Sequence, residues 1–196
     1  MAKTICFIYT ETIKPLYDDN TIIGSHNTNN MVTKKNLYLF SRPISLHYII
    51  GTVTNNLFTE DKHIINIIKP RSMCIDNDIY KNYNITNEYA LENGIEPDEC
   101  ITNFLKSIKS VDFIIGHNIN FHLKTIIAEA MKYNIYINLN NYVIIDIINF
   151  YHKFNLLLIS ELAIKLNIKN IDSKPNIELI RDIFFKLYSK FIKSIN

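Results

Sequence analysis

Residues 111–130, which read VDFIIGHNINFHLKTIIAEA, constrain the fold more than any other part of the chain. The apolar run at 111–115 is rich in β-branched residues and predicts a buried strand. A Gly-His-Asn turn follows it, and residues 120–133 then repeat apolar side chains at helical spacing. The stretch therefore predicts a strand, a tight turn and a helix in direct succession.

The rest of the chain extends this pattern into an α/β fold. Three predicted strands come first, and helices then alternate with the remaining strands, which predicts a mixed central sheet of about five strands flanked by helices. We expect residues 1–196 to form a single domain with a polar insertion at about 14–36. Besides 111–115, strands are predicted at 4–9, 44–53, 62–68 and 142–146, with a turn at about 54–61. Besides 120–133, helices are predicted at 98–110, 147–157, 160–166 and 176–194, with a shorter one near 75–83.

Composition bounds the class of protein. The chain has 196 residues, of which 47% are hydrophobic and 20% charged, so it can bury a core and is not of the disordered type. The net charge of +2 is too small to predict nucleic-acid binding by electrostatics alone.

The cysteines and the apolar runs indicate the compartment. Cys6, Cys74 and Cys100 are odd in number and lack metal-type spacing, which fits a reducing environment. The N-terminus lacks the apolar stretch of a signal peptide, and no apolar run approaches the span of a bilayer. We therefore expect an intracellular protein, cytoplasmic or nuclear, that is neither secreted nor bound in a membrane.

Three segments of the chain resemble motifs of the DnaQ-like (DEDD) 3′–5′ exonucleases, members of the RNase H-like superfamily. Residues 116–122, Gly-His-Asn-Ile-Asn-Phe-His, are similar to the second motif, in which Gly-His-Asn is followed two residues later by Phe-Asp. Residues 9–12, Tyr-Thr-Glu-Thr, are similar to the first motif, Asp-x-Glu-Thr. Ile177 and Asp182 stand at the His and Asp of the third, and Asp146 stands where the family commonly has a structural aspartate. The resemblance covers nearly the whole chain and implies an RNase H-like exonuclease fold.

The family hydrolyses phosphodiesters with two divalent cations held by four carboxylates, because Mg²⁺ prefers charged oxygen ligands. By this resemblance, Glu11 and Asp182 keep their acidic character. Tyr9 replaces the aspartate that bridges both ions, His122 replaces the second-motif aspartate, and Ile177 replaces the general-base histidine. We therefore expect no two-metal site and no cofactor, with Mg²⁺ or Mn²⁺ as the ion if the chain is active.

The residues left at these positions permit two interpretations. Glu11, His122 and Asp182 could bind a single Mn²⁺ or Zn²⁺ as a mixed nitrogen–oxygen cluster. The favoured interpretation is that Tyr9 fills the space of the lost aspartate and that Glu11 and His122 make a simple polar contact. Four further histidines lack ligand spacing and are assigned no role: His26, His47, His63 and His152.

Candidate nucleic-acid contacts are fewer. Lys186, Lys190 and Lys193 share one face of the last predicted helix and could contact phosphates, although a solvated basic face near a helix C-terminus is the default interpretation. The resemblance adds Thr12 and Asn118, the second of which we also expect to hold the Gly-His-Asn turn together.

The expected function is that of a degenerate 3′–5′ exonuclease-like protein, catalytically inactive, that binds single-stranded DNA or RNA or a partner in replication or transcription. Two alternatives stay open. One is an active metal-dependent exonuclease with an altered metal site. The other is a structural interaction subunit that contacts no nucleic acid, which the small net charge and the polar insertion favour. A fold permits an activity without supplying it.

Overall fold

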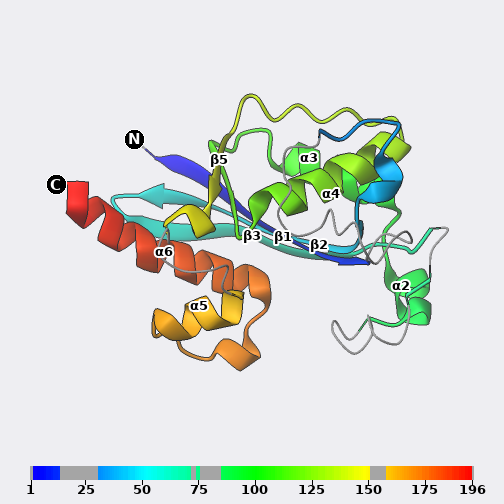
Figure 1. Cartoon of the computed structure of the whole chain (residues 1–196). Coiled ribbons are helices and arrows are strands. Elements are labelled where there is room, and N and C mark those ends of the chain that lie inside the picture. Colours follow the sequence, from blue (N-terminus) through cyan, green and yellow to red (C-terminus); the bar gives the residue numbers. More distant parts are fainter. Residues whose placement is uncertain (1, 14–30, 72–73, 76–84, 151–157, 196) are drawn as a thin grey trace.

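Five strands form one mixed sheet with helices on both faces (Figure 1). The computed structural model describes residues 2–13, 31–71, 74–75, 85–150 and 158–195, with side chains as far as Tyr188. The order across the sheet is β3-β2-β1-β4-β5, and the predicted α/β class with a mixed sheet is confirmed. The strands are β1 Lys3–Ile13, β2 Arg42–Thr54, β3 Leu57–Ile67, β4 Phe113–Gly116 and β5 Val143–Asp146. The helices are α2 Asn87–Asn93, α3 Pro97–Ser107, α4 Ile119–Lys132, α5 Ile159–Lys165 and α6 Asn176–Ile195.

The connections explain why the sheet is mixed. Antiparallel pairing joins β1 to β2 and β2 to β3, whereas β4 pairs parallel with β1 and β5 pairs parallel with β4. A parallel neighbour requires a crossover, and α4 is the crossover between β4 and β5. The predicted strand–turn–helix at 111–133 is observed as β4 followed by α4.

The hairpin between β2 and β3 is tighter than predicted. Its turn consists of Asn55 and Asn56, whose φ angles are 52° and 64°. A two-residue turn with both central φ angles positive matches the twist of the flanking strands, and asparagine tolerates that conformation. The loop predicted at about 54–61 is therefore wrong, and β3 begins at Leu57.

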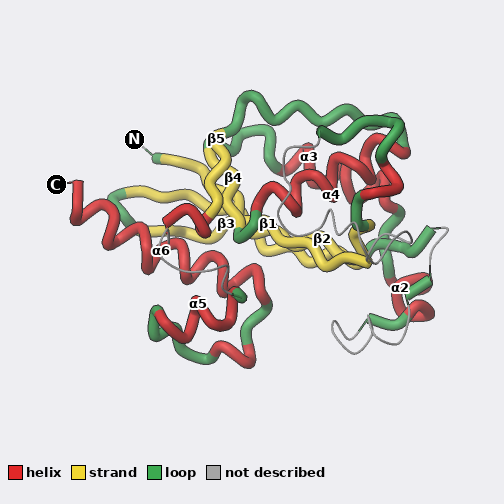
Figure 2. Tube along the Cα trace, in the orientation of Figure 1, coloured by secondary structure: helices red, strands yellow, loops and turns green. Residues whose placement is uncertain are grey.

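Alternating side chains of β1 pack into two separate cores. Phe7 is fully buried on one face against α5 and α6, with its ring in edge contact with Phe58, Phe184 and Phe185. Ile8 is fully buried on the other face against α3 and α4. Figure 2 shows these two pairs of helices on opposite sides of the strands. Because successive strand residues point to opposite faces, a nearly continuous apolar run in β1 serves both cores.

The remaining helices differ partly from the predictions. Helix α2 was not predicted, and it begins where the Thr86 hydroxyl accepts a hydrogen bond from the Tyr89 N–H at 3.0 Å. Residues 147–150 form a 3₁₀ turn, η2, rather than the start of an α-helix, and two more such turns lie at Leu37–Leu39 (η1) and Ile171–Ser173 (η3). The rest of the predicted 147–157 helix, most of the one near 75–83 and most of the 14–36 insertion lie outside the described residues.

A buried ion pair fastens β2 to α4. Glu129, only 1% exposed, accepts two hydrogen bonds from the Arg42 guanidinium, at 2.6 Å on Oε1 and 3.1 Å on Oε2. Lys132 Nζ lies 2.8 Å from Oε2 of the same carboxylate. These cationic partners outweigh the effect of burial and lower the pKa of Glu129.

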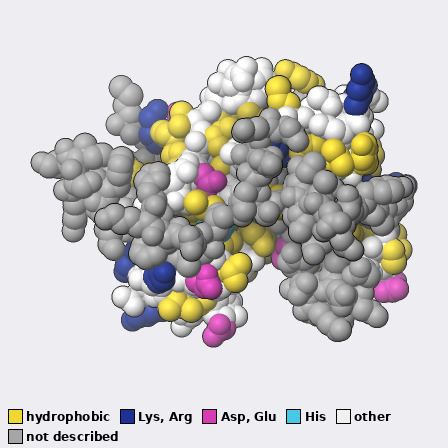
Figure 3. All heavy atoms as spheres, viewed as in Figure 1, with side chains coloured by type: hydrophobic (Ala, Val, Ile, Leu, Met, Phe, Trp, Pro, Cys, Tyr) yellow, Lys and Arg dark blue, Asp and Glu magenta, His cyan; other side chains and the backbone are white. Residues whose placement is uncertain are grey.

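The surface shown in Figure 3 is of mixed character, with dark-blue Lys and Arg side chains gathered at lower left over the region of α5. Among the described helices, none combines the length and the apolarity that crossing a membrane requires.

Candidate functional site

The three segments singled out in the sequence meet around Tyr9, near the end of β1. The Tyr9 ring lies 4.9 Å from the His122 ring, centroid to centroid, and His122 is in the first turn of α4. The Tyr9 hydroxyl accepts a hydrogen bond from Asn176 Nδ2 at 2.9 Å, and Asn176 is the first residue of α6. Ile177 follows it and is fully buried in the core beneath α6. The fold therefore brings Tyr9, His122 and the start of the third segment together.

His122 is held by hydrogen bonds within the protein. Its Nδ1 lies 3.1 Å from the Thr10 backbone nitrogen and 2.8 Å from the Thr10 hydroxyl. Because a backbone N–H can only donate, Nδ1 is the acceptor and the ring proton is on Nε2. The ring also hydrogen-bonds the backbone of His117. Burial, together with the nearby His117 and His47 rings, lowers the pKa of His122 to about 3, so the ring is neutral at physiological pH.

Glu11 lies one strand position beyond Thr10, on the same face of β1 as Tyr9. Its Oε2 accepts a hydrogen bond from the Ser45 hydroxyl at 2.9 Å. Burial raises the pKa of Glu11, and the Ser45 hydrogen bond opposes that rise. The contact expected between Glu11 and His122 is not made, because Glu11 bonds Ser45 on β2 while His122 bonds Thr10.

His47 is a member of this site that the sequence did not reveal. It lies opposite Tyr9 in the β1–β2 register, with ring centroids 6.0 Å apart, and it is only 7% exposed. Neither of its ring nitrogens has a hydrogen-bond partner among the described residues. Its Nε2 lies 3.9 Å from Glu11 Oε2, but burial lowers the pKa of His47 to about 4, so this approach is not an ion pair at neutral pH.

Asp182 is bound by two cationic side chains. Lys174 Nζ donates to its Oδ2 at 2.5 Å, and the Arg181 Nε and Nη2 atoms both lie 3.0 Å from its Oδ1. Arg181 also donates to Glu60 on β3 at 2.7 Å. Asp182 is thus compensated by charges of the chain itself.

The residues at this site do not fit a pair of magnesium ions. The Nδ1 lone pair of His122 accepts a hydrogen bond from Thr10. The Tyr9 hydroxyl already accepts one from Asn176. The Asp182 carboxylate is paired with Lys174 and Arg181. The described part of the chain holds no group of three or more His, Cys, Asp or Glu side chains placed to bind a metal. The cluster of Glu11, His122 and Asp182 considered from the sequence is therefore not formed there.

Comparison with known proteins gives matches to the fold but none to the sequence. No protein-family model and no curated protein matches the sequence. The structure matches exonuclease I bound to product with a TM-score of 0.67 and 12% identity, over 95% of this chain and 43% of the other. It matches E. coli exonuclease I in complex with a dA16 oligonucleotide with a TM-score of 0.66 and 13% identity, over 95% and 41%. The chain has the fold of exonuclease I. It spans less than half the length of these two proteins.

The resemblance to the DnaQ-like exonucleases also predicts a structural aspartate on the fifth strand, and Asp146, at the end of β5, makes structural hydrogen bonds. Its two carboxylate oxygens accept hydrogen bonds from the backbone N–H groups of Asn118 at 3.0 Å and Ile119 at 3.1 Å, where α4 begins. The Ile148 N–H donates to it as well, at 3.1 Å. Asn118 adopts the left-handed conformation, with φ of 53°, and forms the N-cap of α4. Asp146 thus satisfies backbone donors that the helix start leaves without partners.

Replacing Asp146 by alanine should lower the free energy of unfolding by about 2 to 3 kcal/mol, because three backbone donors lose a charged acceptor. Asparagine at this position keeps Oδ1 for Asn118 and Ile148 and loses only the bond from Ile119, so its effect should be smaller. Urea unfolding of the two variants measures the difference. Equal losses would show that the negative charge and the second acceptor oxygen of Asp146 stabilise the helix start, and that the shape of the side chain alone does not.

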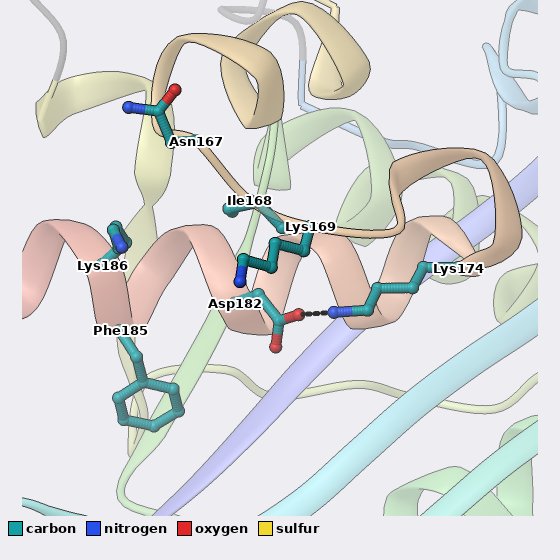
Figure 4. Close-up of a pocket in the computed structure, with 7 residues that line it drawn as sticks. All are labelled: Asn167, Ile168, Lys169, Lys174, Asp182, Phe185 and Lys186. Atoms are coloured by element: carbon teal, nitrogen blue, oxygen red, sulfur yellow. Dashed lines mark hydrogen bonds and ion pairs between the residues drawn. The ribbon is translucent and has the colours of Figure 1, made fainter.

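The residues expected to contact nucleic acid lie on different elements of the fold. Thr12 lies near the end of β1 opposite Pro43, and Asn118 is occupied in capping α4. Lys186 is exposed on α6 and borders a surface hollow that Asp182 also lines (Figure 4). The side chains of Lys190 and Lys193 lie outside the described residues. Their roles as nucleic-acid contacts stay predictions.

Proposed function

We propose that this chain binds single-stranded nucleic acid and does not hydrolyse it. Its fold supports the first half of the proposal, because exonuclease I, with the same fold, is known in complex with oligonucleotides. The residues around Tyr9 support the second half. A protein partner from replication or transcription and an intracellular location stay predictions.

The hydrogen bonds of His122 carry the proposal. A two-metal nuclease needs carboxylate oxygens directed at the ions, so that the ions can hold the attacking and leaving oxygens. In this chain the residue at the second-motif position is a neutral imidazole whose acceptor nitrogen is used by Thr10, 3.1 Å away. Such a side chain supplies neither negative charge nor a free lone pair to a cation.

The two acidic residues that remain do not restore the missing charge. Burial raises the pKa of Glu11, which means that its surroundings disfavour the ionised form. Asp182 is bound to Lys174 and Arg181, and any metal ion would have to displace or tolerate these two cations. Cationic side chains of the protein itself therefore occupy the carboxylate that a metal ion would need.

Nuclease and binding assays on the same preparation test this proposal. Labelled single-stranded DNA and RNA are incubated with the protein in Mg²⁺, Mn²⁺ or EDTA, and products are separated on a denaturing gel. Binding is followed by fluorescence anisotropy at several salt concentrations. We expect binding that weakens with salt, because Lys and Arg contacts release counterions from the phosphates, and no shortening of either substrate.

Two results would contradict the proposal, and a third would reveal contamination. Metal-dependent shortening that disappears in the Glu11→Gln and Asp182→Asn variants would establish an active enzyme with an altered metal site. Shortening that persists in both variants comes from a contaminating nuclease. Absence of binding to either nucleic acid would overturn the nucleic-acid half and favour an interaction subunit.

A further inference from the structure

Lysines from three different segments line a hollow on the α6 side of the molecule. It is lined by Asn167, Ile168, Lys169, Lys174, Asp182, Phe185 and Lys186. Lys169 comes from the turn after α5, Lys174 from the segment after η3, and Lys186 from α6. In Figure 4 the side chains of Lys169 and Lys174 reach toward α6, where Asp182 lies, while Phe185 points away from them.

The charge in this hollow is unbalanced. Three of its lining side chains are ammonium groups, and Asp182 is the single acidic one among the lining residues described. Arg181 does not line the hollow, but it also binds Asp182 and thereby neutralises part of the only negative charge. Arg181 itself is further balanced by Glu60 at 2.7 Å and Glu178 at 3.8 Å. Among the described residues that line the hollow, ammonium groups therefore outnumber carboxylates.

The hollow and the site around Tyr9 are connected through helix α6, which contributes residues to both. Lys174 precedes Asn176 by two residues, and Asn176 donates its hydrogen bond to the Tyr9 hydroxyl. Phe185 also borders the hollow, while its ring packs against Phe7, Phe58 and Phe184 in the core. A strand of nucleic acid that reached Tyr9 would thus pass close to these lysines.

We propose that this hollow binds a backbone phosphate of single-stranded nucleic acid without a metal ion, with Lys174 supplying beside Asp182 the positive charge that a divalent cation supplies in two-metal nucleases. The inference rests on the proposed function and assigns it a location. An ammonium group is a compact point charge with three donors, and lysine is a common phosphate ligand in proteins. The carboxylate of Asp182 holds Lys174 in position and competes with the incoming phosphate for it.

Binding of a labelled oligothymidylate in EDTA tests the lysines. Lys169→Gln and Lys174→Gln should each weaken binding by about 3- to 10-fold and reduce the slope of log K against log salt by about 0.7, as the loss of one phosphate contact on a single strand requires. Lys106→Gln is the matched control, because Lys106 is also exposed but lies on α3, on the other side of the sheet. It should change neither quantity. Thermal unfolding of each variant verifies that it is folded.

The sign of the effect of Asp182→Asn separates this proposal from a metal site. If Lys174 binds the phosphate, removing the competing carboxylate should tighten binding in EDTA by about 2- to 5-fold. If Asp182 is instead a metal ligand, the substitution should weaken binding, and only in the presence of Mg²⁺ or Mn²⁺.

The other possible results contradict the phosphate site, its independence of metal ions, or the proposed function. A wild-type protein that binds in EDTA, with Lys169→Gln and Lys174→Gln unchanged, would place the phosphate elsewhere and leave the proposed function standing. Binding that EDTA abolishes would overturn the metal-independent site. A wild-type protein that fails to bind under any condition would overturn the proposed function itself, and this inference with it.

Discussion

Acidification from neutral pH to about pH 4 is expected to destabilise this protein steeply, because two histidines that are buried and uncharged in the folded chain must accept protons. Burial lowers the pKa of His122 to about 3 and that of His47 to about 4. In the unfolded chain both groups return to an ordinary histidine pKa of about 6.5. Both histidine rings lie close to the Tyr9 ring, so the effect reports on the candidate site.

The direction follows from proton uptake. Between about pH 6.5 and the lowered pKa values, the unfolded chain binds more protons than the folded chain, so the free energy of unfolding falls as pH falls. Each histidine contributes up to about 1.4 kcal/mol per pH unit in this window. Glu11 opposes them, since its raised pKa adds stability as pH falls toward its ordinary value, but it is one group against two.

Urea unfolding across a pH series measures this dependence, and His47→Leu assigns it. Leucine removes a titrating group and two buried ring nitrogens that lack partners among the described residues, so it should stabilise the protein at neutral pH and flatten the pH dependence. His63→Gln is the comparison, because His63 on β3 only adds to the lowering of the His47 pKa that burial causes, so this variant should flatten the pH dependence much less than His47→Leu does. An unchanged pH slope in His47→Leu would exclude His47 as a source of the acid sensitivity.

The local part of the site could be predicted from the sequence, because it depends on contacts between near neighbours. The Gly-His-Asn turn between a strand and a helix sets the position of His122 at the start of α4, and the β1 pattern sets that of Tyr9 and Glu11. Asp182 could not be placed in this way. Asp182 lies five positions after Ile177, which is about 140° around a helix, so a buried Ile177 turns Asp182 toward other partners.

The place of His47 in the site and the first residue of β3 depend on strand register, which the sequence pattern alone did not give. Ser45 and His47 are polar residues in a mainly apolar stretch of β2, which indicates polar neighbours on the next strand. The sequence around them does not identify those neighbours, which are Glu11 opposite Ser45 and Tyr9 opposite His47. The register across β2 and β3 in turn depends on the two-residue Asn55–Asn56 turn. Asn-Asn is a weaker hairpin signal than Asn-Gly, and the predicted strand therefore began five residues too late.

Replacing Arg42 by methionine is expected to lower the free energy of unfolding by about 3 to 5 kcal/mol, because it leaves the carboxylate of Glu129 buried without its main partner. Lys132 remains 2.8 Å from that carboxylate and limits the loss, but it engages only Oε2. The substitution should also raise the pKa of Glu129, which Arg42 now lowers. The link between β2 and α4 would then be strongest at a pH where Glu129 is protonated.

The double variant Arg42→Met, Glu129→Met separates the cost of an unpaired charge from the value of the ion pair. With both charges replaced by apolar side chains of similar length, most of the lost stability should return. Lys3→Met is the matched control, because the Lys3–Asp112 pair is exposed, and it should leave unfolding nearly unchanged. If the double variant were as unstable as Arg42→Met alone, the hydrogen-bonded geometry of the pair, and not the isolated charge of Glu129, would be what β2 and α4 require.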